Sequence, residues 1–187
     1  DKEDGKLAFI DREGNRLNIP GNPESLFCCG YATVSFADGK NFVNKTGRLL
    51  LKDSVTDAGV FQEDVAWILS SNNIYTFIDK NGDRVFSLDK GTVPQGGFSD
   101  GLCCVKKGEN EYSYISRDGK EVLKHFRTAT EFHHGKAYVT KGELSGMLLS
   151  NGAFFPGVRD VSLIAHGAIM IGKGERFRRR ITPAPSN

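Results

Sequence analysis

A motif that recurs about every 34 residues restricts this chain to a small set of folds. Each copy consists of an apolar residue, two variable residues, a small residue or Asp, and then a segment that ends in small/apolar-x-Val/Ile. The copies begin near Phe27, Phe61, Phe98, Phe132 and, in a less regular form, Ile164. A period of this length is typical of stacked supersecondary units, so we expect a repeat array.

A second motif lies between the copies of the first. It consists of an aromatic or apolar residue, a second apolar residue, a polar residue, two further residues and Gly. Its glycines are Gly14, Gly47, Gly82, Gly119 and Gly152. Dipeptides such as Asn81-Gly82 and Asp118-Gly119 tolerate positive φ angles, so a strand that reaches them can reverse as a hairpin. The motif therefore predicts one hairpin in every repeat.

The two motifs together predict three short strands per repeat, with a half repeat at the N-terminus. The 22 glycines and 13 phenylalanines agree with short strands and tight turns. Such a unit buries its apolar face only by stacking on its neighbours. We predict an all-β array of about five three-stranded antiparallel β repeats over residues 1–181, with a flexible tail or linker at 182–187. The array is either open like a solenoid, which the variable repeat lengths favour, or closed like a propeller.

Alternation along the first strand of each repeat predicts the face on which neighbouring repeats pack. Its small members are Ala32, Ala66, Cys103 and Ala137, and its branched members are Val34, Ile68, Val105 and Val139. Small side chains there allow adjacent repeats to approach closely.

From about residue 5 to residue 177, the two motifs resemble the bacterial WG repeat family, whose units read Phe-x-x-Gly-hydrophobic-Ala-x-Val and then Trp-Gly-Tyr-Ile-Asp-x-x-Gly-Lys. The Trp-Gly dipeptide itself is absent from this chain. The pairs in its place are Leu7-Ala8, Lys40-Asn41, Tyr75-Thr76, Tyr112-Ser113 and Ser145-Gly146. The resemblance implies degenerate copies of a β-repeat scaffold that mediates binding.

One residue of the first strand lies between the packing positions in every repeat. These residues are Thr33, Trp67, Cys104, Tyr138 and Met170. In register they form a column, in which Trp67, Tyr138 and Met170 make an apolar stripe suited to holding a partner. The alternative is that both sheet faces are covered and the stripe is core, since large aromatic side chains are mostly buried.

The two variable residues of each first motif are expected to line a rim. They are Cys28/Cys29, Gln62/Glu63, Ser99/Asp100, His133/His134 and Ala165/His166. Several are metal-ligand types, but they belong to separate repeats and no closely spaced ligand pair anchors them. We therefore predict exposed turn residues, with neither a metal site nor a cofactor.

The segment Arg176-Phe177-Arg178-Arg179-Arg180 concentrates four positive charges. Arg178, Arg179 and Arg180 are candidate contacts for phosphates or an acidic partner. The alternative is a solvated end, or a charged edge that blocks strand addition. The formal net charge of +2 lacks the strongly basic balance of a typical nucleic-acid binder.

The four cysteines form two adjacent pairs, Cys28-Cys29 and Cys103-Cys104, without C-x-x-C spacing. Neighbouring residues of a strand point to opposite faces, so one member of a pair can be buried while the other is exposed. Idle thiols are expected, with a disulfide between the pairs as the alternative in an oxidising compartment. The cysteines leave the location open.

Neither a membrane span of roughly 18 apolar residues nor a familiar catalytic motif occurs in the sequence. Because the acidic residues are dispersed among turns, no general acid and base stand out. We predict a non-catalytic module for protein–protein interaction, as an accessory domain of a larger bacterial protein. The alternatives are a secreted or cell-envelope carbohydrate-binding module and, more remotely, a hydrolase with a metal at the rim.

Overall fold

The computed structural model describes residues 8–158 and two short strands, β16 (Gly172–Lys173) and β17 (Arg176–Phe177), which pair with each other. Every regular secondary-structure element in this part of the chain is a β-strand, and every pair of neighbouring strands is antiparallel. The predicted all-β array is thus confirmed. The fifth repeat, which begins at Ile164, and the predicted tail at 182–187 lie outside the described residues, apart from these two strands.

Four sheets of three or four strands follow one another along the chain. The first sheet contains β1 (Asn22–Pro23), β2 (Tyr31–Phe36) and β3 (Gly39–Asn44). The second contains β4 (Asp57–Ala58), β5 (Val65–Leu69), β6 (Tyr75–Asp79) and β7 (Arg84–Ser87). The third contains β8 (Val93–Pro94), β9 (Leu102–Gly108), β10 (Glu111–Ser116) and β11 (Glu121–Phe126). The fourth contains β12 (Thr128–Ala129), β13 (Lys136–Lys141), β14 (Leu144–Leu149) and β15 (Phe154–Pro156).

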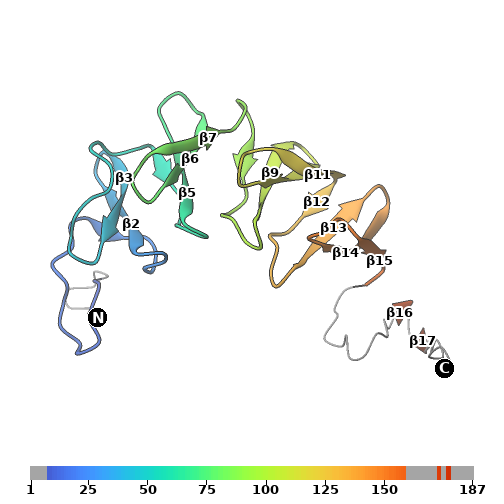
Figure 1. Cartoon of the computed structure of the whole chain (residues 1–187), viewed down its shortest axis with the longest axis horizontal. Helices are drawn as coiled ribbons and strands as arrows, with labels where there is room; N and C mark the ends of the chain where they lie inside the picture. The colour runs from blue at the N-terminus through green and yellow to red at the C-terminus, as the bar shows by residue number, and fades with distance from the viewer. Residues whose placement is uncertain (1–7, 159–171, 174–175, 178–187) are drawn as a thin grey trace, which may run out of the picture.

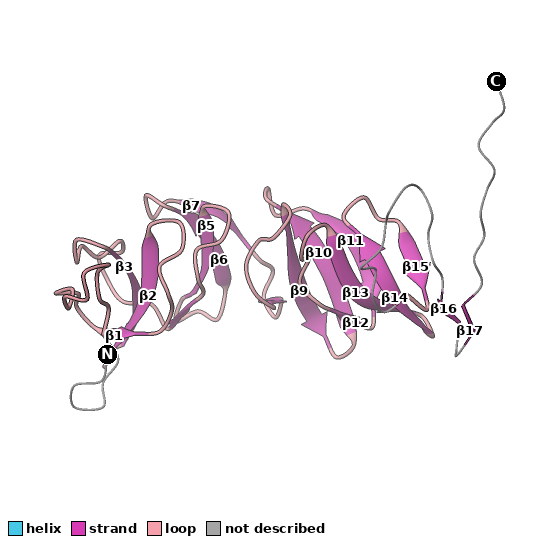
Figure 2. Ribbon diagram, turned by 90° about the horizontal axis from the view of Figure 1, so that it is seen from below, coloured by secondary structure: helices cyan, strands magenta, loops and turns pink. Residues whose placement is uncertain are grey.

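The four sheets stand side by side in a curved row in the order of the sequence, with the first sheet at one end and the fourth at the other (Figure 1). Seen from below, the same order is kept along the row (Figure 2). None of the described sheets closes into a barrel, and together they form an open arc.

Three of the sheets have one strand more than the sequence predicts. The extra strand is the two-residue segment β4, β8 or β12, which pairs with the outer edge of the first long strand. It comes from the return loop before the next motif phenylalanine. Pairing there satisfies backbone groups that an open strand edge would leave to solvent.

The hydrophobic core lies between successive sheets, because each sheet has two apolar faces. The face predicted for packing is confirmed: Ala32, Ala66, Cys103 and Ala137 are each at most 1% exposed. Val34, Val105 and Val139 are also buried, and Ile68 is half-buried. The opposite face carries the large aromatic residue of the second long strand.

One aromatic contact recurs at each of the three interfaces between these sheets. The ring of the second long strand packs edge-on against the motif phenylalanine of the next repeat. The pairs are Phe42–Phe61 with ring centroids 4.7 Å apart, Phe77–Phe98 at 5.3 Å and Tyr114–Phe132 at 4.8 Å. Edge-to-face pairs add to the free energy gained from apolar burial. The motif phenylalanine is therefore the residue with which each repeat docks on the one before it.

Candidate interaction site

Strand register assigns the predicted column to a sheet face. Residues that lie opposite each other in an antiparallel pair share a face of the sheet. Trp67 lies opposite Phe77, and Tyr138 lies opposite Met147. The same holds for Thr33 opposite Phe42 and for Cys104 opposite Tyr114. Thr33, Trp67 and Cys104 therefore lie on faces between sheets, and the column does not run along the outer edge of the array.

The first three members of the column are packed to different degrees. Thr33 and Cys104 are buried, at 2% and 1% exposed. Trp67 is half-buried, packs against the core between the second and third sheets, and meets the ring of Tyr75 edge-on at 5.3 Å. A Cβ atom added to Gly59 would lie only 2.5 Å from the indole nitrogen of Trp67, so this glycine makes room for the ring.

Tyr138 differs from the other members because it is 38% exposed. It lies on the face of the fourth sheet that points away from the third sheet. That face holds an open groove of about 550 Å³. We call it the end groove, and its lining residues are Thr128, Ala129, Thr130, Tyr138, Val139, Thr140, Ser145, Gly146, Gly157 and Val158.

The end groove combines an apolar floor with a row of hydroxyl groups. Gly146 and Val158 are buried beneath it, and Val139, whose side chain packs in the core on the other face of the sheet, also lines it. Thr140 Oγ1 lies 2.8 Å from Thr128 Oγ1 and 2.9 Å from Ser145 Oγ, so the hydroxyl groups hold one another in place. The described residues that line the groove include no carboxylate, imidazole, thiol or amine. Such a surface can bind an apolar or aromatic group but offers no acid–base pair for catalysis.

Gly146 shows why the small second residue of the Trp-Gly position persists. A Cβ atom added to Gly146 would lie 2.2 Å from the backbone oxygen of Phe155, because β15 passes close to β14. Its equivalents Asn41 and Ser113 are buried. The amide of Asn41 is used internally, since its nitrogen donates to the Leu51 carbonyl and its oxygen accepts the Leu51 N–H.

Four of the five predicted rim pairs lie in tight turns with the same geometry, and the fifth, Ala165/His166, lies outside the described residues. The two middle residues of each turn have positive φ, as in type I′ hairpin turns: 53° and 95° at Cys29-Gly30, and 48° and 67° at Glu63-Asp64. The other two turns are Asp100-Gly101 and His134-Gly135. Each turn is closed by an isolated bridge, such as Cys28 with Tyr31.

Carboxylates of the rim join successive repeats. Both carboxylate oxygens of Glu63 accept the backbone N–H of Gly101, at 3.2 and 3.1 Å, and Glu63 also pairs with Arg117 at 3.5 Å. One repeat further on, Asp100 accepts the N–H of Gly135 at 2.7 Å. Within the described residues, no three His, Cys, Asp or Glu side chains are placed to hold a metal ion. The sequence pattern located this row of turns but did not reveal that its acids join the repeats.

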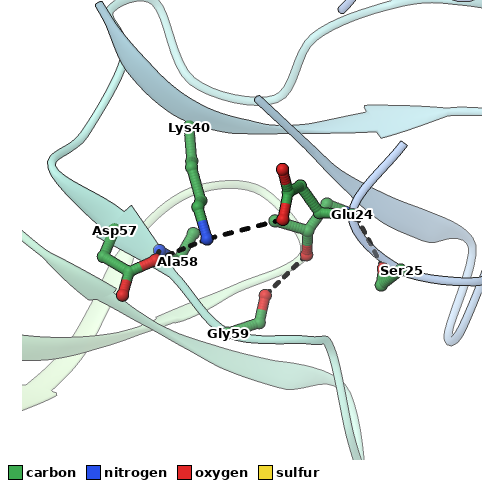
Figure 3. Close-up of polar contacts among 7 residues, drawn as sticks. Glu24, Ser25, Lys40, Asp57, Ala58 and Gly59 are labelled. Carbon is green, nitrogen blue, oxygen red and sulfur yellow. Dashed lines mark hydrogen bonds and ion pairs between the residues drawn. The ribbon is translucent and has the colours of Figure 1, made fainter. Parts of the chain in front are cut away.

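A second polar seam joins the first and second sheets on Lys40. Its ammonium group lies 2.9 Å from Asp57 and 3.8 Å from Glu24, as Figure 3 shows. The hydrogen bond to Asp57 is the main cause that raises the pKa of Lys40 above its ordinary value. Beside this cluster, the hydroxyl of Thr33 donates to the Gly59 carbonyl at 2.6 Å. These contacts hold neighbouring sheets together and explain why Thr33 is polar yet buried.

The cysteines are free thiols, and their surroundings differ. Cys103 and Cys104 are buried on opposite faces of β9, and burial is the main cause that raises the pKa of Cys104 to about 12 and raises that of Cys103 further. Cys28 and Cys29 are half-buried in the first tight turn. Burial, followed by the neighbouring Cys29 thiol, raises the pKa of Cys28.

The other predicted binding residues, Met170, Arg178, Arg179 and Arg180, lie outside the described residues. In the part of the chain that the structure covers, no helix has the length and apolar character needed to cross a bilayer.

A protein-family model supports the repeat assignment. A family model described as a WG containing repeat matches residues 112–144, from the start of β10 to the start of β14. The predicted resemblance to WG repeats is thereby confirmed. No curated protein matches the chain. Among solved structures, BamB from Moraxella catarrhalis matches with a TM-score of 0.44 and 12% identity. That match covers 73% of this chain and 45% of BamB, so the chain spans less than half the length of that protein.

Proposed function

We propose that this chain, a β-repeat array that carries a WG containing repeat, is a non-catalytic module that binds a protein partner, with the end groove as its binding site. The observation that carries the proposal is the repetition of one docking mode. In three successive sheets, the face that holds the column residue receives the motif phenylalanine of the next repeat. The fourth sheet presents the equivalent face as an open groove.

The equivalence indicates what a partner would have to supply. At the third interface, the next repeat supplies Phe132 against Tyr114, together with the small residue Ala137 and the branched residue Val139. A partner for the end groove is expected to offer an aromatic or large apolar side chain on a β hairpin. Met147 stands where the earlier sheets have an aromatic ring. A methionine adapts to differently shaped groups, which suits a surface that binds a partner from outside the repeat array.

A carbohydrate is the second candidate ligand. Tyr138 is partly exposed beside the hydroxyl groups of Thr130, Thr140 and Ser145. An aromatic ring with nearby hydroxyl groups can bind a sugar by stacking and hydrogen bonding. Trp67, the other ring of the predicted stripe, lies at the core between the second and third sheets and not in this groove. Binding roles for Trp67, Met170, Arg178, Arg179 and Arg180 stay predictions.

Site-specific photo-crosslinking tests the proposal. A photoreactive phenylalanine analogue replaces Tyr138 in one protein and Val122, which is 49% exposed on the third sheet, in a control protein. In extract from the native host, the analogue at position 138 is expected to capture a discrete protein that position 122 does not capture. Capture at neither position, or binding of oligosaccharides in place of a protein, would contradict the proposal. A cross-link from position 138 to residues 159–187 of the same chain would also contradict it.

A further inference from the structure

The two Cys-Cys dipeptides of this chain differ in how their side chains are directed: one pair points to opposite faces of a strand, and the other pair lies close together. On β9, Cys103 packs in the core between the second and third sheets, while Cys104 packs in the core between the third and fourth. In the first tight turn, the sulfur atoms of Cys28 and Cys29 lie 3.6 Å apart. The positive φ of Cys29, 53°, breaks the alternation of a strand and allows both side chains to lie on the same side.

The distance between two sulfur atoms limits the bonds that they can form. A disulfide has its sulfur atoms about 2.05 Å apart, so these two would have to approach by roughly 1.5 Å. Two thiolates on one tetrahedral Zn²⁺, with Zn–S bonds of about 2.3 Å, have their sulfur atoms about 3.8 Å apart. The observed 3.6 Å therefore suits a single atom bonded to both sulfurs better than a direct sulfur–sulfur bond.

The thiols of the turn are also more accessible than those of β9, and Cys29 packs at the margin of the core between the first and second sheets. Cys28 and Cys29 are half-buried, whereas Cys103 and Cys104 are at most 1% exposed. Glu63 and Asp100, at the position of Cys29 in later repeats, bond to the next turn. Within residues 8–158, the hydrogen-bond partner of the Cys29 sulfur is the Cys28 sulfur.

We propose that Cys28 and Cys29 form a dithiol site that binds one thiophilic metal or metalloid centre through both sulfur atoms. Thiolates favour soft centres over the hard cations that carboxylates bind. With an organoarsenic(III) oxide, two S–H bonds and the As=O bond break, two As–S bonds form and one water molecule leaves. Neither sulfur nor arsenic changes its oxidation state, so no oxidant or reductant is consumed.

Mass spectrometry of the folded full-length chain with phenylarsine oxide tests the site. One adduct per chain is expected, mapped to Cys28 and Cys29, stable to excess monothiol and removed by a dithiol. Cys28→Ser and Cys29→Ser are each expected to weaken binding at least tenfold, because one sulfur cannot chelate. Cys103→Ala is the matched control, since the equivalent residues Ala32, Ala66 and Ala137 are alanines. This variant should bind as the wild type does.

Several results would overturn the proposal. They are the absence of an adduct, an adduct on Cys103 and Cys104, and an adduct that survives the loss of either turn cysteine. Closure of the turn pair by oxidised glutathione, with loss of two hydrogens and no arsenical binding, would also overturn it. If a serine variant loses its β-sheet circular dichroism, the wild-type chain alkylated at Cys28 and Cys29 replaces it. The alkylated chain is expected not to bind, and binding by it would count against the site.

Discussion

The face of the second sheet that holds Trp67 and the face of the fourth sheet that holds Tyr138 are built from equivalent residues. The second sheet packs Phe77 and Phe86 against Phe98 of the next repeat, and Trp67 lies at the edge of that core. The fourth sheet has Met147 in place of Phe77 and presents a groove beside Tyr138. The comparison teaches that one sequence position packs against a core inside the array and lines a groove on the fourth sheet.

The largest expected effect comes from removing the ring at the internal face. Phe98 is 1% exposed and touches two other rings, so Phe98→Ala should lower the free energy of unfolding by about 3–5 kcal/mol. Urea denaturation followed by circular dichroism measures the loss. Leu144→Ala, at a residue 58% exposed, is the control, with an effect within about 0.5 kcal/mol. If Phe98→Ala lowered the free energy of unfolding no more than Leu144→Ala, the Trp67 face of the second sheet would not be an internal packing face.

The next effect comes from filling the space beside Trp67. Gly59→Ala places a methyl group 2.5 Å from the indole nitrogen, which should cost about 1–3 kcal/mol and shift the fluorescence of the sole tryptophan. Gly108→Ala is the matched control, because its nearest neighbour would lie 3.7 Å away. Equal thermal stability and unchanged fluorescence in the Gly59 variant would show that the indole is not held at this face.

At the end groove we expect a small effect on folding and a large one on binding. Tyr138→Ala should lower the free energy of unfolding by about 1 kcal/mol or less, since the side chain is partly solvated. Affinity for the captured partner should fall at least about tenfold, as for an aromatic anchor of an interface. Trp67→Phe should keep that affinity. If Trp67→Phe also lost affinity for the partner, the result would support a binding role for the whole predicted stripe.

The smallest expected effect concerns pH. Lys107 Nζ lies 2.7 Å from Glu121 Oε2 in the third sheet, and this hydrogen bond is the main cause that lowers the pKa of Glu121 below 4.5. A carboxyl with a lowered pKa in the folded state stabilises the fold above its unfolded pKa. This contribution disappears as the pH falls through the lower, folded-state pKa. Melting temperatures of wild type and Glu121→Gln should therefore converge on acidification, whereas Tyr138→Ala should keep a constant offset from wild type. If the melting temperatures of wild type and Glu121→Gln differ by the same amount at every pH, the pair of Lys107 and Glu121 adds nothing to stability.

The packing of the array was predictable from the sequence because the same residue types recur at the same positions. The small residues such as Ala66 and the branched residues such as Val105 are buried as the alternation indicates, and three motif phenylalanines, Phe61, Phe98 and Phe132, are buried with them. The hairpin turns were predictable for the same local reason. Gly82 and Gly119 have φ angles of 86° and 80°, in the range that glycine adopts readily.

The candidate site was only partly predictable. The sequence treated Tyr138 and Trp67 as equivalent members of one stripe, whereas Tyr138 lies at the end groove and Trp67 lies against an internal core. Which column residue is covered depends on what stacks on each sheet, and that is a property of the array and not of the repeat. The two-residue strands β4, β8 and β12 were missed because they carry no alternation that would distinguish them from a loop.

Three core clusters in the described part join sheets that are neighbours in the sequence, and the fourth packs the first sheet against the residues that precede it. Among the residues that the structure describes, no strand pairing or core cluster connects the first sheet to the fourth, as it would in a closed ring. A chain of this kind that is pulled from its ends is expected to come apart one sheet at a time, each rupture releasing a similar length of chain. Under load, such an array is therefore expected to lengthen in steps while the remaining sheets keep their shape.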